Sequence, residues 1–201
     1  ADEVRREGGR RAEERRRLGV ADDEILIGTV ANLRATKGYP DLLLAAREVI
    51  RATDSVSFVV VGRGPLQSEL QDQHRRLGLG DRFRFLGFRP DAVGVMSAFD
   101  VFCLPSRHEG LPVVLMEALA LGLPVVATRV GGVAELVTDG EDAVLVPASR
   151  PERLAEALLA LARDPQRRSA MAERARARSE TFDAPRSVRT IEAVYREIAN
   201  R

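Results

Sequence analysis

The chain has no tryptophan, two histidines and one cysteine in 201 residues. A lone Cys103 cannot form an internal disulfide, and the sequence has no CxxC pair or histidine cluster that would hold a structural zinc ion. No apolar run approaches the roughly 20 residues of a membrane-spanning helix. The charged opening stretch also lacks the apolar segment of a signal peptide. We therefore expect a cytoplasmic protein without a structural metal or a cofactor, although the intact protein could lie at the inner face of the membrane.

The charge balance also lacks an excess of either sign, with 31 basic against 30 acidic residues. Nothing in this balance indicates nucleic acid or an acidic membrane as a partner. The arginine-rich segment 5–17 is interpreted as a solvated helix face, with a membrane-surface contact as the alternative. The hydrophobic share of 45% and the chain length suit one folded domain. Because the chain does not begin with Met, we expect it to belong to a longer protein.

Short apolar runs alternate with helical stretches from residue 25 onward, which is the pattern of βαβ units. Strands are predicted at 25–31, 56–61, 83–86, 101–104, 125–128 and 143–146. Helices are predicted at 10–18, 40–53, 65–77, 92–98, 111–121, 133–137, 151–162, 165–179 and 185–199. Pro65 and Pro151 are expected in first helical turns, and Gly78 and Gly122 at helix ends. The sequence thus predicts an α/β fold, a Rossmann-like doubly wound sheet of about six parallel strands with helices on both faces.

In a doubly wound sheet, ligands bind at the carboxyl ends of the strands, so we expect the functional residues in the loops there. The first, ANLRATKGY, contains Lys37, the only lysine beside 30 arginines. A compact ammonium kept in such a chain favours a definite partner such as a diphosphate; chance placement beside Gly38 is the alternative. The loop matches neither GxGxxG nor GxxxxGK(S/T). The loop GRGPL, with Gly62 and Gly64, is equally typical of a tight turn.

The segment after the fourth strand, PSRHEGLPVVLMEALALG, carries two glutamates eight residues apart. Glu109 is expected just before a helix and Glu117 on its third turn, so the two could contact different ends of one ligand. The helix start between them would attract phosphate. Alternatively, Glu109 caps the helix and Glu117 pairs with an arginine. His108 either contacts a ligand or is incidental.

Two other features are open to a structural or a ligand-binding interpretation. The glycines of TRVGGVAELV either let the backbone approach a bound sugar or phosphate, or simply form a turn. His74 lies on a charged predicted helix and is interpreted as structural.

Together these segments resemble the C-terminal, donor-binding domain of the GT-B retaining glycosyltransferases of family 4, also called glycosyl transferases group 1. The resemblance spans nearly the whole chain. It is carried, in order, by ANLRATKGYPDLL, VVVGRGPLQSEL, FLGFRPD, DVFCLPSRHEGLPVVLMEALALGLPVVAT and VGGVAELVTDGEDAVLVP.

The resemblance implies a metal-independent transferase that uses a nucleotide diphosphate sugar and retains the anomeric configuration; the sequence contains no DxD motif. It implies that Lys37 contacts the diphosphate, that Glu109 is the catalytic carboxylate against the sugar hydroxyls, and that Glu117 holds the ribose. Asn32 stands where the family often has arginine, so Arg34 would take that role, and Pro112 stands where glycine is common. The other implied donor-binding positions are Gly62, Leu86, Gly87, His108, Gly110, Leu111 and Val113.

The resemblance also sets the expected organisation. We expect a polar N-terminal helix or linker at 1–20, a Rossmann-like core at 21–180, and a C-terminal helix at 181–201 that packs on an N-terminal acceptor domain absent from this chain. Such a chain would bind the donor without transferring the sugar.

Three alternatives stay open: an epimerase-like GT-B enzyme, a nicotinamide-dependent dehydrogenase and a non-catalytic nucleotide-binding module. The two glutamates with Lys37 favour the transferase, and the missing glycine fingerprint argues against the dehydrogenase. The base, the sugar, the acceptor and the oligomeric state are not specified by the sequence.

Overall fold

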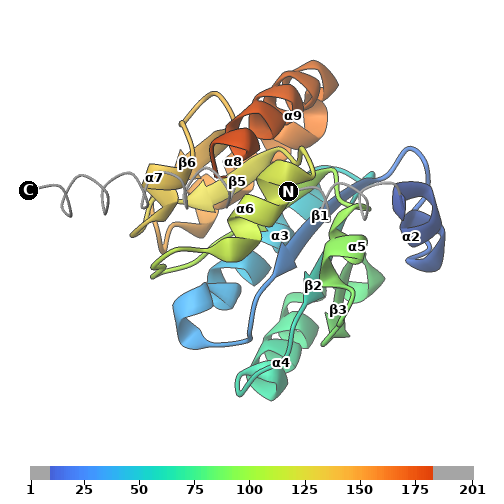
Figure 1. The fold of residues 1–201 in the computed structure, drawn as a ribbon. Helices are drawn as coiled ribbons and strands as arrows, with labels where there is room; N and C mark the ends of the chain where they lie inside the picture. The colour runs from blue at the N-terminus through green and yellow to red at the C-terminus, as the bar shows by residue number, and fades with distance from the viewer. Residues whose placement is uncertain (1–9, 183–201) are drawn as a thin grey trace, which may run out of the picture.

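A computed structural model describes residues 10–182, so the helix predicted at 185–199 lies outside the described residues (Figure 1). Six parallel strands form one sheet in the order β3-β2-β1-β4-β5-β6. This order is that of the doubly wound Rossmann sheet, which confirms the predicted fold class. The strands are β1 (Ile25–Val30), β2 (Val56–Val61), β3 (Phe83–Gly87), β4 (Val101–Leu104), β5 (Val125–Thr128) and β6 (Ala143–Val146).

The helices follow the strands as a crossover pattern requires, and most begin within two residues of the predicted positions. They are α2 (Arg11–Arg17), α3 (Tyr39–Ala52), α4 (Gln67–Leu77), α5 (Ala92–Met96), α6 (Val113–Ala120), α7 (Val133–Leu136), α8 (Pro151–Arg163) and α9 (Pro165–Ser179). Short 3-10 turns lie at Ala35–Lys37, Gly80–Arg82 and Glu180–Phe182. Pro151 is the first residue of α8, and Gly78 ends α4 at φ 65°, as expected.

Two helix starts differ from the prediction. Pro65 precedes α4 instead of lying in its first turn, and the amide of the next residue, Leu66, bonds the Leu33 carbonyl at 3.2 Å. Helix α6 begins at Val113 and not at Leu111, because Pro112 disfavours the helical conformation for the residue before it. Glu117 therefore lies on the second turn of α6.

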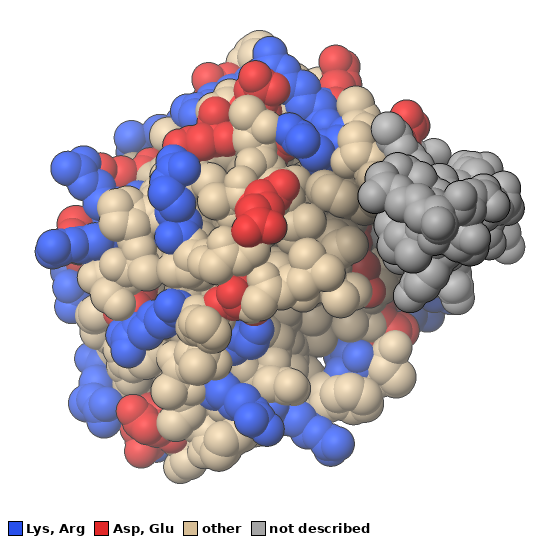
Figure 2. All heavy atoms as spheres, turned by 60° about the vertical axis from the view of Figure 1, so that its left-hand side comes forward, with Lys and Arg blue, Asp and Glu red and all other residues tan. Residues whose placement is uncertain are grey.

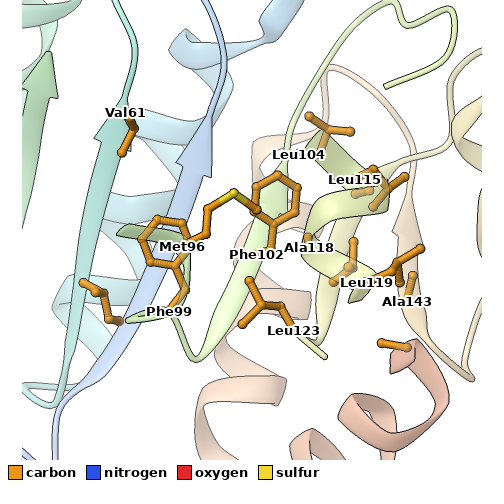
Figure 3. Packing of buried hydrophobic residues seen from close by; sticks show 14 of the residues in the cluster. Val61, Met96, Phe99, Phe102, Leu104, Leu115, Ala118, Leu119, Leu123 and Ala143 are labelled. Atoms are coloured by element: carbon orange, nitrogen blue, oxygen red, sulfur yellow. The ribbon is translucent and has the colours of Figure 1, made fainter. Parts of the chain in front are cut away.

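The core fills both faces of the sheet, and every residue of β2, β4 and β5 is buried, as expected for strands covered on both sides. Helices α3, α4 and α8 pack on one face, and α5 and α6 on the other. Figure 3 shows part of the core on the face covered by α5 and α6, where Leu115 and Leu119 of α6 lie beside Met96, Phe99 and Phe102. Helix α9 packs against both α6 and α8. The sheet is thus a fixed platform for the loops at its edges.

Helix α2 has a solvated face, as predicted, since Glu13, Arg16 and Arg17 are exposed, but its other side packs into the protein. Glu14 and Arg15 are buried, although the sequence around them is almost entirely charged. The Arg15 guanidinium pairs with Asp100 at 2.9 Å and donates to the carbonyls of Ala98, Ala21 and Glu24. These carbonyls lie in loops that offer no strand partner, and arginine's several donors satisfy them together. The polar composition of α2 concealed this packing.

Figure 2 shows acidic and basic side chains interspersed with uncharged ones over one face of the molecule. No surface of a single sign extends over that face, in line with the balanced composition. Within residues 10–182, none of the helices combines the length and apolar character needed to cross a bilayer.

Candidate functional site

The loops after β1 and β4 meet at the point where the strand order reverses. The chain runs outward through β2 and β3 on one side of β1, and through β5 and β6 beyond β4 on the other. Because all six strands are parallel, their carboxyl ends share one edge, and the gap between neighbouring loops at this switch point is the usual ligand site of such folds. Lys37 follows β1 and Glu109 follows β4. The topology alone therefore brings these two predicted residues to the same place.

Lys37 and Glu109 are in direct contact although 72 positions separate them in the chain. The Lys37 ammonium lies 2.8 Å from Oε1 and 2.9 Å from Oε2 of Glu109. The Ser106 hydroxyl donates a further hydrogen bond to Oε1 at 2.5 Å. The Glu109 side chain is only 6% exposed, whereas that of Lys37 is 25% exposed. The site thus holds a fixed carboxylate and a more accessible ammonium.

The backbone of the two loops is held together by close packing. Gly38 adopts φ 65°, and a Cβ at this position would lie 1.9 Å from the Pro105 carbonyl oxygen. The Thr36 carbonyl accepts hydrogen bonds from the amides of Arg107, at 2.7 Å, and His108, at 3.3 Å. These contacts require glycine at position 38, so its place after the lysine is a demand of tertiary packing as well as of the turn.

An ion pair also holds the loop after β4 against α3. The Arg107 guanidinium binds both carboxylate oxygens of Asp41, on α3, at 3.0 Å each. Such a bidentate pair fixes orientation as well as distance. The sequence analysis did not predict a role for Ser106 or Arg107. Their position two to three residues before Glu109 was the only signal available.

The glycine pair after β5 packs against the loop that carries Glu109. A Cβ on Gly131 would lie 1.8 Å from the Glu109 carbonyl oxygen, and one on Gly132 would lie 2.2 Å from that of Gly110. The Gly132 amide also bonds the Gly110 carbonyl at 3.1 Å. The structure therefore explains these glycines by contact with the protein's own backbone. Approach to a sugar or phosphate at the same glycines stays a prediction.

Helix α6 begins beside this junction, with Leu111 and Val113 exposed by 64% and 62%. The Glu109 side chain does not cap the helix, since the N-cap is Pro112 and the Glu109 carboxylate bonds Lys37 and Ser106 instead. Glu117 is half-buried, and desolvation raises the pKa of its carboxyl group. Among residues 10–182 it forms no ion pair, so the predicted alternative of an arginine partner is not observed.

A pocket of about 250 Å³ lies at the same sheet edge, over β1, β2 and β3. Two of the predicted positions, Asn32 and Gly62, line it, and the Gly62 amide bonds the Gly87 carbonyl at 2.8 Å beside Leu86. Phe88, which sequence reasoning missed, lines the pocket with a ring that is 61% exposed. The remaining lining residues are Val30, Ala31, Val61, Arg89 and Ala92.

Several neighbours of this pocket have contacts or positions that bear on the predictions. The Arg63 guanidinium lies 4.9 Å from the centre of the Phe88 ring. Arg34 and His108 are exposed on the loops after β1 and β4, and their roles stay predictions. His74 packs against Phe83 and Phe85, as a structural residue would. Between residues 10 and 182, no three histidine, cysteine or carboxylate side chains gather in a way that could hold a metal ion.

The chain is similar to curated proteins that transfer sugars. It is 36% identical over 168 residues to the alpha-D-kanosaminyltransferase of Streptomyces kanamyceticus, covering 83% of this chain and 43% of that protein. It is also 36% identical over 201 residues to the D-inositol 3-phosphate glycosyltransferase of Kribbella flavida, covering 94% and 47%. The chain therefore spans about half the length of the curated relatives it matches.

Solved structures give the same result at the level of the fold. The HepE protein of Anabaena, solved in complex with UDP, superposes with a TM-score of 0.87 at 31% identity, over 94% of this chain and 53% of HepE. The C-terminal domain of a glycosyl transferase group 1 family protein from Francisella tularensis superposes with a TM-score of 0.78 at 24% identity, over 86% and 92%.

A family model also matches most of the chain. The model described as "Glycosyl transferases group 1" matches residues 10–178, which is nearly all of the described structure. Together with the relatives above, it decides the assignment: the chain belongs to the glycosyl transferases group 1 family.

Proposed function

We propose that this chain binds a nucleotide diphosphate sugar at the β1–β4 edge of the sheet, as the donor-binding domain of a retaining, metal-independent glycosyltransferase. The contact between Lys37 and Glu109 carries this proposal. It places a cation and a buried carboxylate at the switch point, beside the start of α6. A diphosphate needs the first of these groups, and sugar hydroxyls need the second.

Each charged group at the site has its own role in this proposal. Lys37 and the free amides at the start of α6 neutralise the diphosphate, which is the leaving group when the sugar departs. Glu109 accepts hydrogen bonds from the sugar hydroxyls and stabilises the positive charge that develops on the sugar. Glu117, half-buried and without an ion pair among the described residues, accepts the ribose hydroxyls.

The remaining predicted positions divide between the two ends of the donor. Leu86 and Gly87 border the base, next to the pocket over β1, β2 and β3 that Asn32 and Gly62 line. Arg34, His108, Gly110, Leu111 and Val113 contribute to the diphosphate and the sugar.

Transfer itself requires a second domain. The chain spans about half the length of its curated relatives, so we propose that an N-terminal acceptor domain completes the cleft in the intact enzyme. In this organisation 1–20 forms the polar entry segment, 21–180 the core, and 181–201 the helix that packs on the other domain. On its own the chain binds the donor without turnover.

The base is proposed to be uracil, because HepE binds UDP and is 31% identical to this chain. A thermal-shift panel of UDP, GDP, ADP and their glucose conjugates tests the choice, since a ligand raises the melting temperature by mass action. An epimerase-like enzyme would share the binding result but not the transfer. Turnover of the full-length protein separates these functions, and a full-length chain that binds the donor without any turnover would favour a binding module.

Lys37→Ala tests the site itself. Loss of the ammonium should weaken UDP binding by about ten- to a hundredfold, the range expected for a hydrogen bond to a charged group. Isothermal titration calorimetry measures the change. Arg51→Ala is the matched control, because Arg51 is an exposed cation near the far end of α3. If both variants bind UDP with equal affinity, the proposed site is wrong.

A further inference from the structure

The Lys37 ammonium is neutralised within the protein. Both oxygens of Glu109 lie within 2.9 Å of it, so the cation that is to meet a diphosphate already has a carboxylate partner. We propose that this pair is an autoinhibitory contact: a nucleotide diphosphate binds only by drawing the ammonium away from Glu109, and the pair thereby favours the intact donor over the free nucleoside diphosphate. The inference rests on the function proposed above and concerns regulation of the same site.

The exchange involves the lysine and not the loops. The two loops are held by the close approach of Gly38 to Pro105, by the Thr36 carbonyl and by the bidentate Arg107–Asp41 pair. Separating them would break all of these contacts at once. The Lys37 side chain, by contrast, is partly exposed and has a flexible four-carbon stem. The ammonium can therefore move while the backbone stays in place.

Glu109 cannot follow the lysine. Its side chain is 6% exposed, the Ser106 hydroxyl binds Oε1, and its carbonyl oxygen is packed against Gly131. When the ammonium leaves, a buried carboxylate retains one hydrogen bond and loses its cation. That state is costly, because a buried charge without a partner is strongly disfavoured. The same carboxylate also repels the incoming phosphates.

The nature of the ligand determines whether this cost is offset. An intact donor brings sugar hydroxyls, which can donate hydrogen bonds to Glu109 in place of the ammonium. A nucleoside diphosphate brings no such donors to that carboxylate, so it bears the full cost of breaking the pair. The pair therefore weakens binding of the nucleoside diphosphate more than binding of the donor, and it helps the nucleoside diphosphate to leave after transfer.

Glu109→Gln gives the signature of this contact. The variant keeps the side-chain shape and an oxygen that can accept the Ser106 hydrogen bond, but it releases Lys37. We expect UDP to bind about three- to tenfold more tightly, between the effects of an exposed and a buried ion pair. UDP-glucose should gain less than UDP. The ratio of the two affinities should fall accordingly.

Calorimetric titration of the 201-residue chain with UDP and UDP-glucose, with GDP and ADP pairs in parallel, measures the ratio. Glu152→Gln, an exposed charge on α8, is the control for net charge and should leave both affinities unchanged. The gain in UDP affinity should shrink when Glu109→Gln is made in a Lys37→Ala background, because no ammonium is left to release. An equal gain in both backgrounds would show simple repulsion and overturn the proposal.

Two further results keep the inference separate from the proposed function. If Lys37→Ala weakens UDP binding but Glu109→Gln weakens it too, the site stands and the autoinhibitory contact is wrong. If the wild-type chain binds none of the nucleotides, both fail. Should Glu109→Gln unfold, Ser106→Ala provides the second test: it leaves the carboxylate dependent on the ammonium alone, so UDP should bind more weakly than to the wild-type chain, and unchanged or tighter binding would contradict the inference.

Discussion

Replacing Gly38 by alanine tests whether the packing of the two loops creates the site. Gly38 adopts φ 65°, where an L-residue costs about 1 kcal/mol, and its Cβ would lie 1.9 Å from the Pro105 carbonyl oxygen. That separation is well short of a van der Waals contact, so the loops must part. The two hydrogen bonds accepted by Thr36 would then be lost, at about 1 kcal/mol each. Gly38→Ala should therefore lower the free energy of unfolding by roughly 3 kcal/mol.

Gly78→Ala is the matched control for this substitution. Gly78 also adopts φ 65°, but a Cβ there meets nothing within 4 Å. Its cost should be the conformational one alone, about 1 kcal/mol. At about 2–4 °C per kcal/mol for a domain of this size, we expect losses in melting temperature of about 6–12 °C for Gly38→Ala and about 2–4 °C for Gly78→Ala.

Urea denaturation and UDP titration together provide the assay. Gly38→Ala should lower both the free energy of unfolding and the affinity for UDP, because the loop that carries Lys37 would move away from the loop after β4 and from the start of α6. Gly78→Ala should change stability only. Equal destabilisation by the two variants, or full UDP affinity in Gly38→Ala, would refute the argument that the close approach of the loops builds the site.

Three more predictions follow from the described contacts. Burial raises the pKa of Glu117 in the folded chain, so the charged carboxylate destabilises the fold once the pH exceeds the unfolded pKa. Glu117→Gln should therefore stabilise the chain more at pH 7 than at pH 4 in urea unfolding. The same substitution should weaken UDP binding. Arg15→Met leaves Asp100 paired with Arg11 alone and removes the donor to the carbonyls of Ala98, Ala21 and Glu24, so it should cost about 2–4 kcal/mol in urea unfolding; a loss below 1 kcal/mol would contradict the burial argument. Phe88→Ala should weaken UDP binding about fivefold by calorimetry with an unchanged melting temperature, because the exposed ring lines the pocket over β1, β2 and β3.

Much of the fold could be predicted because its signals are local. The runs VSFVVV and VVAT are continuously apolar, and a strand of that kind must be covered on both faces. Proline and glycine marked most helix ends for the same reason, since each acts on its own turn. Of the two wrong helix starts, the one before Pro112 has a local cause, because proline disfavours the helical conformation in the residue before it.

The candidate site was predicted only in part. Lys37 was predicted because it is the only lysine, and Glu109 and Glu117 because of their spacing around a helix start; their roles stay predictions. The sequence did not identify Ser106 or Phe88, whose roles depend on neighbours from other segments.

The sequence by itself determined the order of strands and helices, the family and the residue types at the sheet edge, because these depend on local pattern and composition. Only the tertiary structure decided that Lys37 and Glu109, 72 positions apart, form one ion pair, and that the glycines at 131 and 132 pack against the loop carrying that glutamate. It likewise decided that Arg15 is buried in a helix that looks solvated. Contacts of this kind arise where loops from distant parts of the chain meet, as the loops after β1 and β4 do at the switch point, and from shape complementarity between loops. Neither leaves a signal within any one segment.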